Sequence, residues 1–311
     1  MAVSVWGWQL RMTDILVLGK TGQVAQALRK TLPGDGSVVF AGRALVDLTR
    51  PATVEALLAN ERPRVVINAA AYTAVDKAES EPEIARLVNA IAPSVAARAA
   101  AAIDAAFIQY STDYVFDGEA GRPYTEDDPT APLGVYGRTK LEGEMAVSEA
   151  NARHVILRTS GVFGADGANF VKTMLSLAEE CDAVDVVHNQ FGRPTFADDL
   201  ALVGATVAKR LTSDGGKGLH GVFHAAGSLD ASWYDFAREI MIQSAQRGGP
   251  SCAVRALAGA DYRGAARRPR DSRLDSGRLA AVYGIQPGSW RDGLGVTLDR
   301  LRTEPRQTGV T

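Results

Sequence analysis

The chain has 311 residues, of which 46% are hydrophobic and 23% charged, and its 34 basic and 36 acidic side chains give a formal net charge of −2 at pH 7. This composition is typical of a soluble globular protein with one large domain or two ordinary ones. The balanced charge argues against nucleic acid or an anionic membrane as a partner. No apolar run reaches the roughly 18 residues that a membrane helix needs, so we expect small-molecule partners.

The cysteines and the opening residues bear on the compartment. Cys181 and Cys252 are the only cysteines, and neither lies in a CxxC or Cys/His cluster. A disulfide scaffold and a zinc site are therefore disfavoured, and a reduced, cytoplasmic setting is expected. Residues 1–11 have no basic leader and no small-residue cleavage site, which argues against a secretory signal. We expect them to be an extension outside the fold.

Short apolar runs alternate with helical patterns in the first half of the chain. The runs predict buried strands at residues 14–19, 37–41, 64–68, 106–111 and 154–159. Helical spacing predicts helices between them, at residues 23–30, 51–60, 81–103 and 140–150. Continuous apolar strands separated by helices are typical of a parallel sheet covered on both faces. The sequence therefore predicts an α/β fold with a doubly wound parallel sheet.

The pattern loosens after about residue 160, where loops rich in Gly, Asn and Pro interrupt it. Such loops often carry binding determinants on a rigid scaffold. We predict a dinucleotide-binding domain at residues 13–160, rejoined by about 196–226. A smaller substrate-binding lobe is predicted at residues 161–195 and 227–311, where Trp233, Tyr234 and Phe236 should pack a helix against the core.

A glycine-rich loop, GKTGQVA, follows the first predicted strand. Gly19 permits a tight turn, Gly22 lets the backbone approach a pyrophosphate, and Ala25 is small enough for close packing of the next helix. The spacing is GxxGxxA rather than GxGxxG. On this loop alone, a turn without a ligand is as good an interpretation as a dinucleotide site.

The end of the second predicted strand bears on the choice of cofactor. A carboxylate there would hold the ribose 2′-hydroxyl of NADH, but this chain has Arg43, which can pair with the 2′-phosphate of NADPH. NADPH is therefore favoured, although a solvated surface arginine is nearly as good an interpretation. Asp47 and Leu48 could reach the adenine, which leaves NADH open.

Tyr136 and Lys140 lie one helical turn apart on one side of a predicted helix. A phenol is a poor acid at neutral pH, and an ammonium at i+4 is expected to lower its pKa and to reach the cofactor ribose. Ser111 and Thr112 end a predicted strand, where one hydroxyl could hydrogen-bond a carbonyl being reduced. Because YxxxK also occurs by chance, this reductase hypothesis depends on Thr112 and on the glycine loop.

Other polar residues are predicted to be structural or remain open. The four histidines show no spacing typical of metal ligands and are interpreted as core or surface residues; they are His154, His188, His220 and His224. The segment Arg263–Arg273 contains five arginines in eleven residues. A solvated face and a diphosphate-binding segment are equally good interpretations of it.

Together these features resemble the extended short-chain dehydrogenase/reductases, and among them the dTDP-4-dehydrorhamnose reductase family. The resemblance runs from Met12 to about Leu294 through GKTGQVA, VINAAAYTAVDKAESEPE, STDYVFDG, YGRTKLEGE, LRTS, FGRPTFADDL, FHAAG with SWYDFA, and RRPRDSRLD. It implies a Rossmann fold with a smaller C-terminal substrate lobe. It also implies NAD(P)H-dependent reduction of the 4-keto group of dTDP-6-deoxy-L-lyxo-4-hexulose to dTDP-L-rhamnose, a precursor of cell-wall polysaccharide.

The resemblance implies roles for the matching residues. The cofactor would be lined by Gly19, Thr21, Gly22, Gln23, Val24, Arg43, Asp47, Leu48, Ala71, Tyr72, Thr73, Tyr136 and Lys140. Thr112 and Tyr136 would polarise the keto group, with Tyr136 giving the proton and Lys140 tuning it. Thr112, Asp113 and Gly161 would line the sugar-nucleotide site, and Arg193 would bind the diphosphate.

Two departures from the family stand out. Gly161 occupies a position where the family usually has a tryptophan that helps to form the sugar pocket, so we expect a wider pocket or one filled from elsewhere. Ala25 replaces the usual third glycine, which is a lesser change. Some members of the family bind Mg²⁺ at a dimer contact through several glutamates, and we cannot place these here. A Mg²⁺ requirement and a homodimer both stay open.

Other functions stay open beside this reductase. One is a reductase or epimerase of another nucleotide 4-keto-sugar, or a dehydratase, although a dehydratase usually has an acidic pair where this chain has Asp113 and Tyr114. Another is a non-enzymatic regulatory subunit of the same fold. Intact Tyr136 and Lys140 favour an enzyme.

Overall fold

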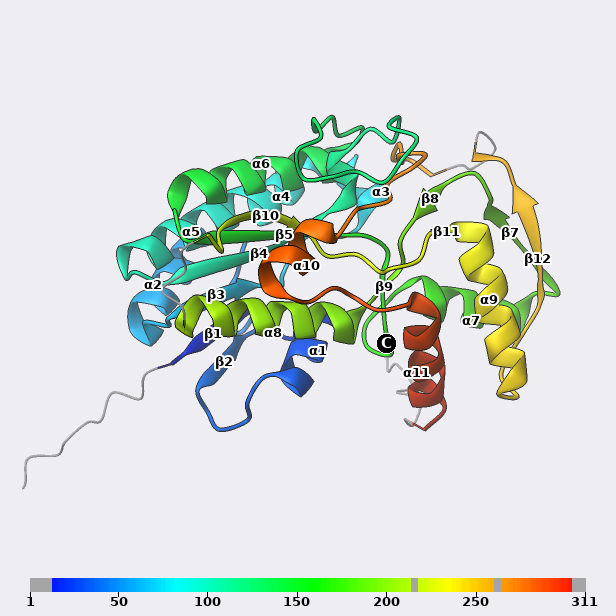
Figure 1. The fold of residues 1–311 in the computed structure, drawn as a ribbon, viewed down its shortest axis with the longest axis horizontal. Coiled ribbons are helices and arrows are strands. Elements are labelled where there is room, and N and C mark those ends of the chain that lie inside the picture. Colours follow the sequence, from blue (N-terminus) through cyan, green and yellow to red (C-terminus); the bar gives the residue numbers. More distant parts are fainter. Residues whose placement is uncertain (1–12, 214–217, 260–263, 304–311) are drawn as a thin grey trace, which may run out of the picture.

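A parallel six-stranded sheet forms the centre of the computed structural model, which describes residues 13–213, 218–259 and 264–303 (Figure 1). The spatial order is β10-β5-β4-β3-β1-β2, and neighbouring strands are parallel. The strands are β1 (Ile15–Leu18), β2 (Val38–Ala41), β3 (Val65–Asn68), β4 (Ala106–Thr112), β5 (His154–Thr159) and β10 (Gly221–His224). The predicted doubly wound fold is confirmed, and five strands were predicted to within one residue at each end.

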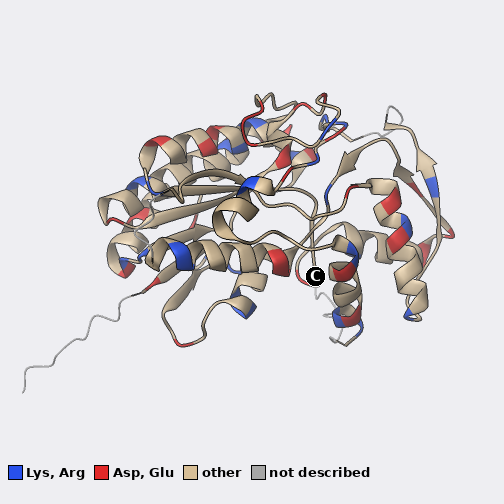
Figure 2. Ribbon diagram, viewed as in Figure 1, with Lys and Arg blue, Asp and Glu red and all other residues tan. Residues whose placement is uncertain are grey.

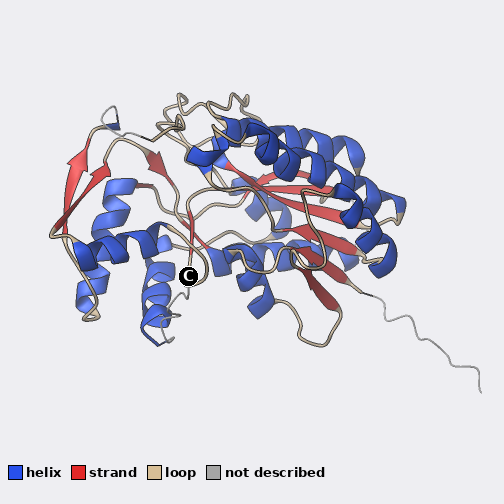
Figure 3. Ribbon diagram, turned by 180° about the vertical axis from the view of Figure 1, so that it is seen from behind, coloured by secondary structure: helices blue, strands red, loops and turns tan. Residues whose placement is uncertain are grey.

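Helices cover both faces of this sheet (Figures 1 and 3). One face carries α1 (Gln23–Thr31) and α8 (Ala197–Ser213), and the other carries α2 (Pro51–Glu61), α5 (Ala92–Ala102) and α6 (Val135–Ala150). Side chains along β1 alternate between the two cores, since Val17 packs on the first and Leu16 and Leu18 pack on the second. Both faces of the sheet are therefore buried, which explains the continuous apolar runs in the sequence.

The predicted helix at residues 81–103 is in fact three segments. They are α4 (Pro82–Arg86), the π-helical turn η1 (Leu87–Ile91) and α5. Pro93 has no N–H, so it cannot bond the carbonyl of Asn89 as an α-helix would require. That carbonyl instead faces α6, where a Cβ on Gly143 would lie only 2.1 Å from its oxygen. The π turn thus allows α6 to pack directly on the backbone of η1.

A second lobe carries its own core. It is built from α7 (Phe170–Glu180), β7 (Ala183–Val187), α9 (Trp233–Gln246), β12 (Ala253–Leu257) and α11 (Trp290–Thr303), with the short strands β6 (Val162–Phe163), β8 (Phe191–Gly192), β9 (Thr195–Phe196) and β11 (Ala231–Ser232). The rings of Phe163, Phe236 and Trp290 pack together in it. The predicted packing of Trp233, Tyr234 and Phe236 against a core is confirmed.

Two segments join the first core from later in the chain. Strand β10 is part of the central sheet, and helix α8 packs on it. Helix α10 (Gly277–Tyr283) packs on the same core, although it lies within the segment predicted for the substrate lobe. Leu279 and Tyr283 of α10 are buried against the first core, and the Tyr283 ring packs on Phe223 of β10.

Charged residues of both signs are interspersed along the outer helices (Figure 2). Residues 1–11, predicted to be an extension, lie outside the described residues.

Candidate active site

The predicted triad lies at the carboxyl end of the sheet. Thr112 is the last residue of β4, and it is only 5% exposed. Tyr136 and Lys140 occupy the first turns of α6, which begins at Val135, five residues before the predicted start. Gly137 lets this helix approach the turn after β4, η2 (Asp113–Val115), closely, since a Cβ there would lie 2.1 Å from the Tyr114 carbonyl oxygen. The structure therefore brings Thr112, Tyr136 and Lys140 together.

The pKa of Tyr136 differs from the expectation. Its burial raises the pKa to about 12, and a hydrogen bond with the Thr112 side chain opposes only part of that rise. The prediction that the Lys140 ammonium lowers this pKa is wrong for the structure as it stands, because desolvation of the phenolate outweighs the other effects. Tyr136 is accordingly a neutral phenol at physiological pH. This is the protonation state that a proton donor needs.

Lys140 is buried, with 3% of its surface exposed. Its Nζ donates a hydrogen bond of 2.6 Å to the carbonyl oxygen of Tyr110. Burial lowers the pKa of Lys140 to about 8, and the carboxylate of Glu144 opposes the shift. The ammonium form therefore predominates at neutral pH and is lost above about pH 8.

A buried ion pair lies one helical turn beyond Lys140. Arg158 of β5 and Glu144 of α6 are 6% and 4% exposed at their side chains, and Arg158 Nη2 lies 2.7 Å from Glu144 Oε2. The Ser111 hydroxyl donates to Glu144 as well. We did not predict this pair from the sequence. A signal was present, since Glu144 follows Lys140 by the same four residues that separate Lys140 from Tyr136.

Asp113 turns into the protein. It is 4% exposed, its Oδ1 lies 3.0 Å from Thr112 Oγ1, and its Oδ2 accepts a hydrogen bond of 2.8 Å from Ser160. Burial raises the pKa of its carboxyl group, while hydrogen bonds from Ser272, Ser160 and Thr112 lower it. Sequence reasoning missed Ser160 and Ser272, which surround this carboxyl group.

The glycine loop has the geometry expected of a phosphate site. Gly19 has φ +120°, and a Cβ there would lie 3.3 Å from the Ala69 carbonyl carbon. Gly22 is the N-cap of α1 and offers no side-chain hydrogen bond to the helix, while Thr21 and Gly22 are exposed. The N–H groups of the first turn of α1 thus face an open surface, which suits an anion.

Gln23 has an additional role that the sequence did not reveal. Its Nε2 donates to the carbonyl oxygens of Val162 and Ala168, each at 3.4 Å, and Asn169 Nδ2 donates to its Oε1 at 3.1 Å. The side chain therefore ties α1 to the loop that opens the second lobe. Val24, the next predicted cofactor residue, is partly buried against the first core.

The other predicted cofactor residues lie at the ends of β2 and β3. Arg43 is exposed, and Asp47 accepts hydrogen bonds from the backbone and hydroxyl of Thr49, which lower its pKa. Leu48 is partly buried. The loop after β3 carries Ala71, Tyr72 and Thr73.

Asn89 of η1 positions that loop, a role the sequence analysis missed. Its Oδ1 accepts the Tyr72 N–H at 2.9 Å, and its Nδ2 donates to the Tyr72 carbonyl at 3.2 Å and to Thr139 Oγ1 at 3.1 Å. The π turn therefore links the loop after β3 to the helix that bears Tyr136. Single π turns are frequent at functional sites.

Gly161 adopts the left-handed conformation, with φ +53°. A Cβ at this position would lie 3.3 Å from Pro194 Cα and 3.6 Å from Cη2 of Trp233. The indole of Trp233, from α9, thus occupies the space in front of Gly161.

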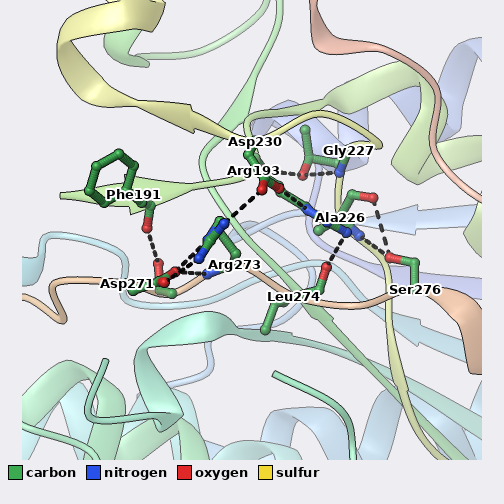
Figure 4. Close-up of polar contacts among 11 residues, drawn as sticks. Phe191, Arg193, Ala226, Gly227, Asp230, Asp271, Arg273, Leu274 and Ser276 are labelled. Atoms are coloured by element: carbon green, nitrogen blue, oxygen red, sulfur yellow. Dashed lines mark hydrogen bonds and ion pairs between the residues drawn. The ribbon is translucent and has the colours of Figure 1, made fainter. Parts of the chain in front are cut away.

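Arg193 takes part in a network of charged side chains (Figure 4). Its Nε donates to Asp230 at 2.7 Å and its Nη1 to the Leu274 carbonyl at 2.7 Å. Arg273 also pairs with Asp230, at 2.8 Å, and with Asp271, at 2.6 Å. The arginine-rich segment is therefore not simply a solvated face. Of its other members, Arg268 pairs with Asp76, and Arg263 lies outside the described residues.

One of the four histidines lies in the protein interior. His224 is fully buried, and its Nδ1 lies 3.0 Å from the Tyr124 carbonyl oxygen. Among the described residues, no group of three or more His, Cys, Asp or Glu side chains could hold a metal ion. In the same part of the chain, no helix has the length and apolar character needed to cross a membrane.

Comparison with known proteins decides the family. The family model "RmlD substrate binding domain" matches residues 12–303. A dTDP-4-dehydrorhamnose reductase from Sinorhizobium fredii is 43% identical over 278 residues, which cover 89% of this chain and 94% of that protein. The chain belongs to the dTDP-4-dehydrorhamnose reductase family.

Other relatives extend the comparison. The solved structure of a dTDP-4-dehydrorhamnose reductase from Bacillus anthracis in complex with NADP has a TM-score of 0.84, is 31% identical, and covers 93% of this chain and 99% of that one. A probable dTDP-4,6-dihydroxy-2-methyloxan-3-one 4-ketoreductase from Streptomyces antibioticus is 39% identical over 283 residues, or 90% of this chain and 92% of that protein. Membership in this family makes the chain an NAD(P)H-dependent oxidoreductase.

Proposed function

We propose that the protein reduces the 4-keto group of dTDP-6-deoxy-L-lyxo-4-hexulose with NADPH, forming dTDP-L-rhamnose. The observation that carries this proposal is the cluster of Thr112, Tyr136 and Lys140 at the carboxyl end of β4, in a chain of this family. Open α/β sheets bind ligands at this edge. The neutral phenol of Tyr136 is in the state required to give a proton.

The residues fit a bound dinucleotide. The uncapped first turn of α1, together with Gly19 and Gly22, would hold the pyrophosphate, and Arg43 would pair with a 2′-phosphate. Asp47, Leu48 and the loop Ala71–Thr73 would line the rest of the cofactor, and Lys140 would approach the ribose. When bound, NADPH supplies the hydride that carbon C4 of the sugar receives. NADPH use is supported by the relative from Bacillus anthracis, which was solved with NADP.

The chain's own groups supply the proton. Tyr136 gives its hydroxyl proton to the keto oxygen as C4 gains a hydride, so the C=O bond becomes a CH–OH group. The Thr112 hydroxyl hydrogen-bonds the same oxygen and stabilises its developing negative charge. The Lys140 ammonium stabilises the resulting Tyr136 phenolate until it regains a proton.

The sugar nucleotide would lie against the second lobe. Gly161 and the Trp233 indole would border the sugar. Arg193, held in place by Asp230 and the Leu274 carbonyl, would approach the diphosphate from the loop before Pro194.

Reduction of a different nucleotide keto-sugar is the second candidate. Two observations favour it: Gly161 where the family usually has tryptophan, and 39% identity to the 4-ketoreductase relative from Streptomyces antibioticus. The choice between the two substrates would then depend on the residues that line the sugar pocket and not on the catalytic cluster.

The direct test follows NADPH oxidation by its absorbance, with enzymatically prepared dTDP-6-deoxy-L-lyxo-4-hexulose, and identifies the product by NMR. Formation of dTDP-L-rhamnose with one NADPH oxidised per sugar is expected. Turnover of other 4-keto sugar nucleotides but not of this one would support the second candidate. Binding of NADPH without turnover of any of them would contradict both.

A further inference from the structure

The hydrogen bonds of the Thr112 hydroxyl constrain how it can act. A threonine hydroxyl has one proton to donate and two lone pairs to accept with. Thr112 Oγ1 accepts the backbone N–H of Tyr114 at 3.2 Å, lies 3.0 Å from Asp113 Oδ1, and hydrogen-bonds Tyr136. Its single proton can therefore serve either Asp113 or a keto oxygen, but not both.

The ionisation of Asp113 decides between these uses. A carboxylate can only accept, so an ionised Asp113 takes the Thr112 proton and leaves Thr112 as an acceptor toward Tyr136. In that state Thr112 has nothing to donate to the keto oxygen, and the Tyr136 proton is drawn toward Thr112. If Asp113 instead carries a proton on Oδ1, it donates to Thr112, and the protons of Thr112 and Tyr136 are both available to the keto oxygen.

The surroundings of Asp113 favour the neutral acid. The side chain is 4% exposed, and hydroxyl groups of Thr112, Ser160 and Ser272 surround it. The titratable groups that face it are the phenols of Tyr114 on η2 (Asp113–Val115) and of Tyr136 on α6. Within the described part of the chain no cation is paired directly with this carboxyl group, and burial of this kind penalises a carboxylate and raises the pKa of Asp113.

Among the described residues, a cation lies next to Tyr114. Arg268 hydrogen-bonds the Tyr114 side chain and is itself paired with Asp76, at 2.5 Å. Its charge is therefore shared with a carboxylate of its own, and the direct partners of Asp113 are hydroxyl groups and its own backbone N–H.

We propose that Asp113 acts as a neutral carboxylic acid that donates its proton to Thr112 and thereby leaves the Thr112 proton for the keto oxygen of the substrate. Asp113 is then a positioning residue, which acts on the keto oxygen through Thr112. The role in turnover rests on the proposed function, whereas the protonation state of Asp113 does not.

The first test is an infrared difference spectrum between the wild type and Asp113→Asn, recorded at pH 7 with NADPH bound. The amide is nearly isosteric, and it can donate to Thr112 while accepting from Ser160. The wild type should show the carbonyl band of a protonated carboxylic acid that the variant lacks. Carboxylate bands in its place would overturn the proposal whatever the substrate proves to be.

A second variant keeps the test decisive if Asp113→Asn does not fold. Ser160→Ala removes a donor whose hydrogen bond lowers the pKa of Asp113. The pH at which the acid band disappears should therefore be higher in Ser160→Ala than in the wild type. Absence of the band in both proteins at pH 7 would overturn the proposal.

Turnover gives an independent readout. Asp113→Asn replaces a neutral acid with an amide that cannot ionise, so it should retain the general acid catalysis by Tyr136, which is worth about 10²-fold or more. If kcat of the wild type declines at the pH where its acid band disappears, that decline should be absent from Asp113→Asn. The decline caused by deprotonation of Lys140 should remain. Asp185→Asn, an exposed acid of β7, should keep the wild-type profile.

A folded Asp113→Asn protein with kcat lowered about 100-fold at every pH would overturn the proposal. If the wild type shows the acid band but reduces no 4-keto sugar nucleotide, the proposed function fails and the protonation state of Asp113 stands.

Discussion

Replacement of Gly143 by alanine should destabilise the fold and disturb the active site together. The new Cβ in α6 would lie 2.1 Å from the Asn89 carbonyl oxygen and 3.1 Å from its carbon. Both atoms are backbone, so η1 or α6 must move. Overpacking of this kind costs about 3 kcal/mol. The better helix propensity of alanine offsets about 1 kcal/mol. We expect a net loss of about 2 kcal/mol, or roughly 4 °C in melting temperature for a chain of this size.

The same shift should reach the chemistry. Asn89 holds Tyr72 and Thr139, and Thr139 precedes Lys140 on α6. A displacement of about 1 Å at reacting groups can lower turnover about 100-fold. Thermal unfolding followed by circular dichroism, together with kcat, measures both effects.

A second helical glycine provides the control. At Gly295 of α11 the nearest atom to a new Cβ is Arg247 Nη2, the end of a flexible side chain, at 2.9 Å. Gly295→Ala should be neutral or stabilising by up to about 1 kcal/mol. Wild-type melting temperature and turnover in Gly143→Ala would refute the close contact between α6 and η1.

The remaining predictions concern the cofactor and the proton donor. Tyr136→Phe should lower kcat by about 10²–10⁴-fold, because the phenol is the proton donor, while the Kd for NADPH stays nearly constant. Tyr234→Phe in the second lobe is the matched control. Equal turnover in both variants would remove Tyr136 from the mechanism. Arg43→Ala should weaken NADPH binding about tenfold or more, because a charge-assisted hydrogen bond worth about 1.5–3 kcal/mol is lost, and it should have little effect on NADH binding. If calorimetry shows equal losses of affinity for both cofactors, Arg43 does not pair with the 2′-phosphate. Because burial lowers the pKa of Lys140 to about 8, its charge is lost as the pH rises through 8, and the Kd for NADPH should increase between pH 7 and pH 9.5. In Lys140→Met that increase should be absent, and an affinity of the wild type that does not change over this range would contradict the role of the ammonium.

The sheet and the spacing of Tyr136 and Lys140 could be predicted because both depend on local pattern. Buried parallel strands require continuous apolar runs, and a separation of four residues places two side chains on one helix face wherever the helix lies. The π turn at Leu87–Ile91 was missed, since it depends on the packing of η1 against Gly143 as much as on Pro93.

The protonation states could not be predicted from spacing. The ammonium at i+4 was expected to lower the pKa of Tyr136, but burial has the larger effect, and only the folded structure shows that burial. The two oxygens of Asp113 form hydrogen bonds with Thr112 and with Ser160, which lies 47 residues farther along the chain. Contacts of this kind follow from tertiary structure.

Transfer of a label from the cofactor to the sugar tests the central claim most directly. NADPH that carries deuterium at the transferable position would be incubated with dTDP-6-deoxy-L-lyxo-4-hexulose, and the product examined by NMR. The account predicts deuterium at C4 of dTDP-L-rhamnose, with one NADPH oxidised per sugar. A product without deuterium at C4, or conversion of the sugar without oxidation of NADPH, would contradict it.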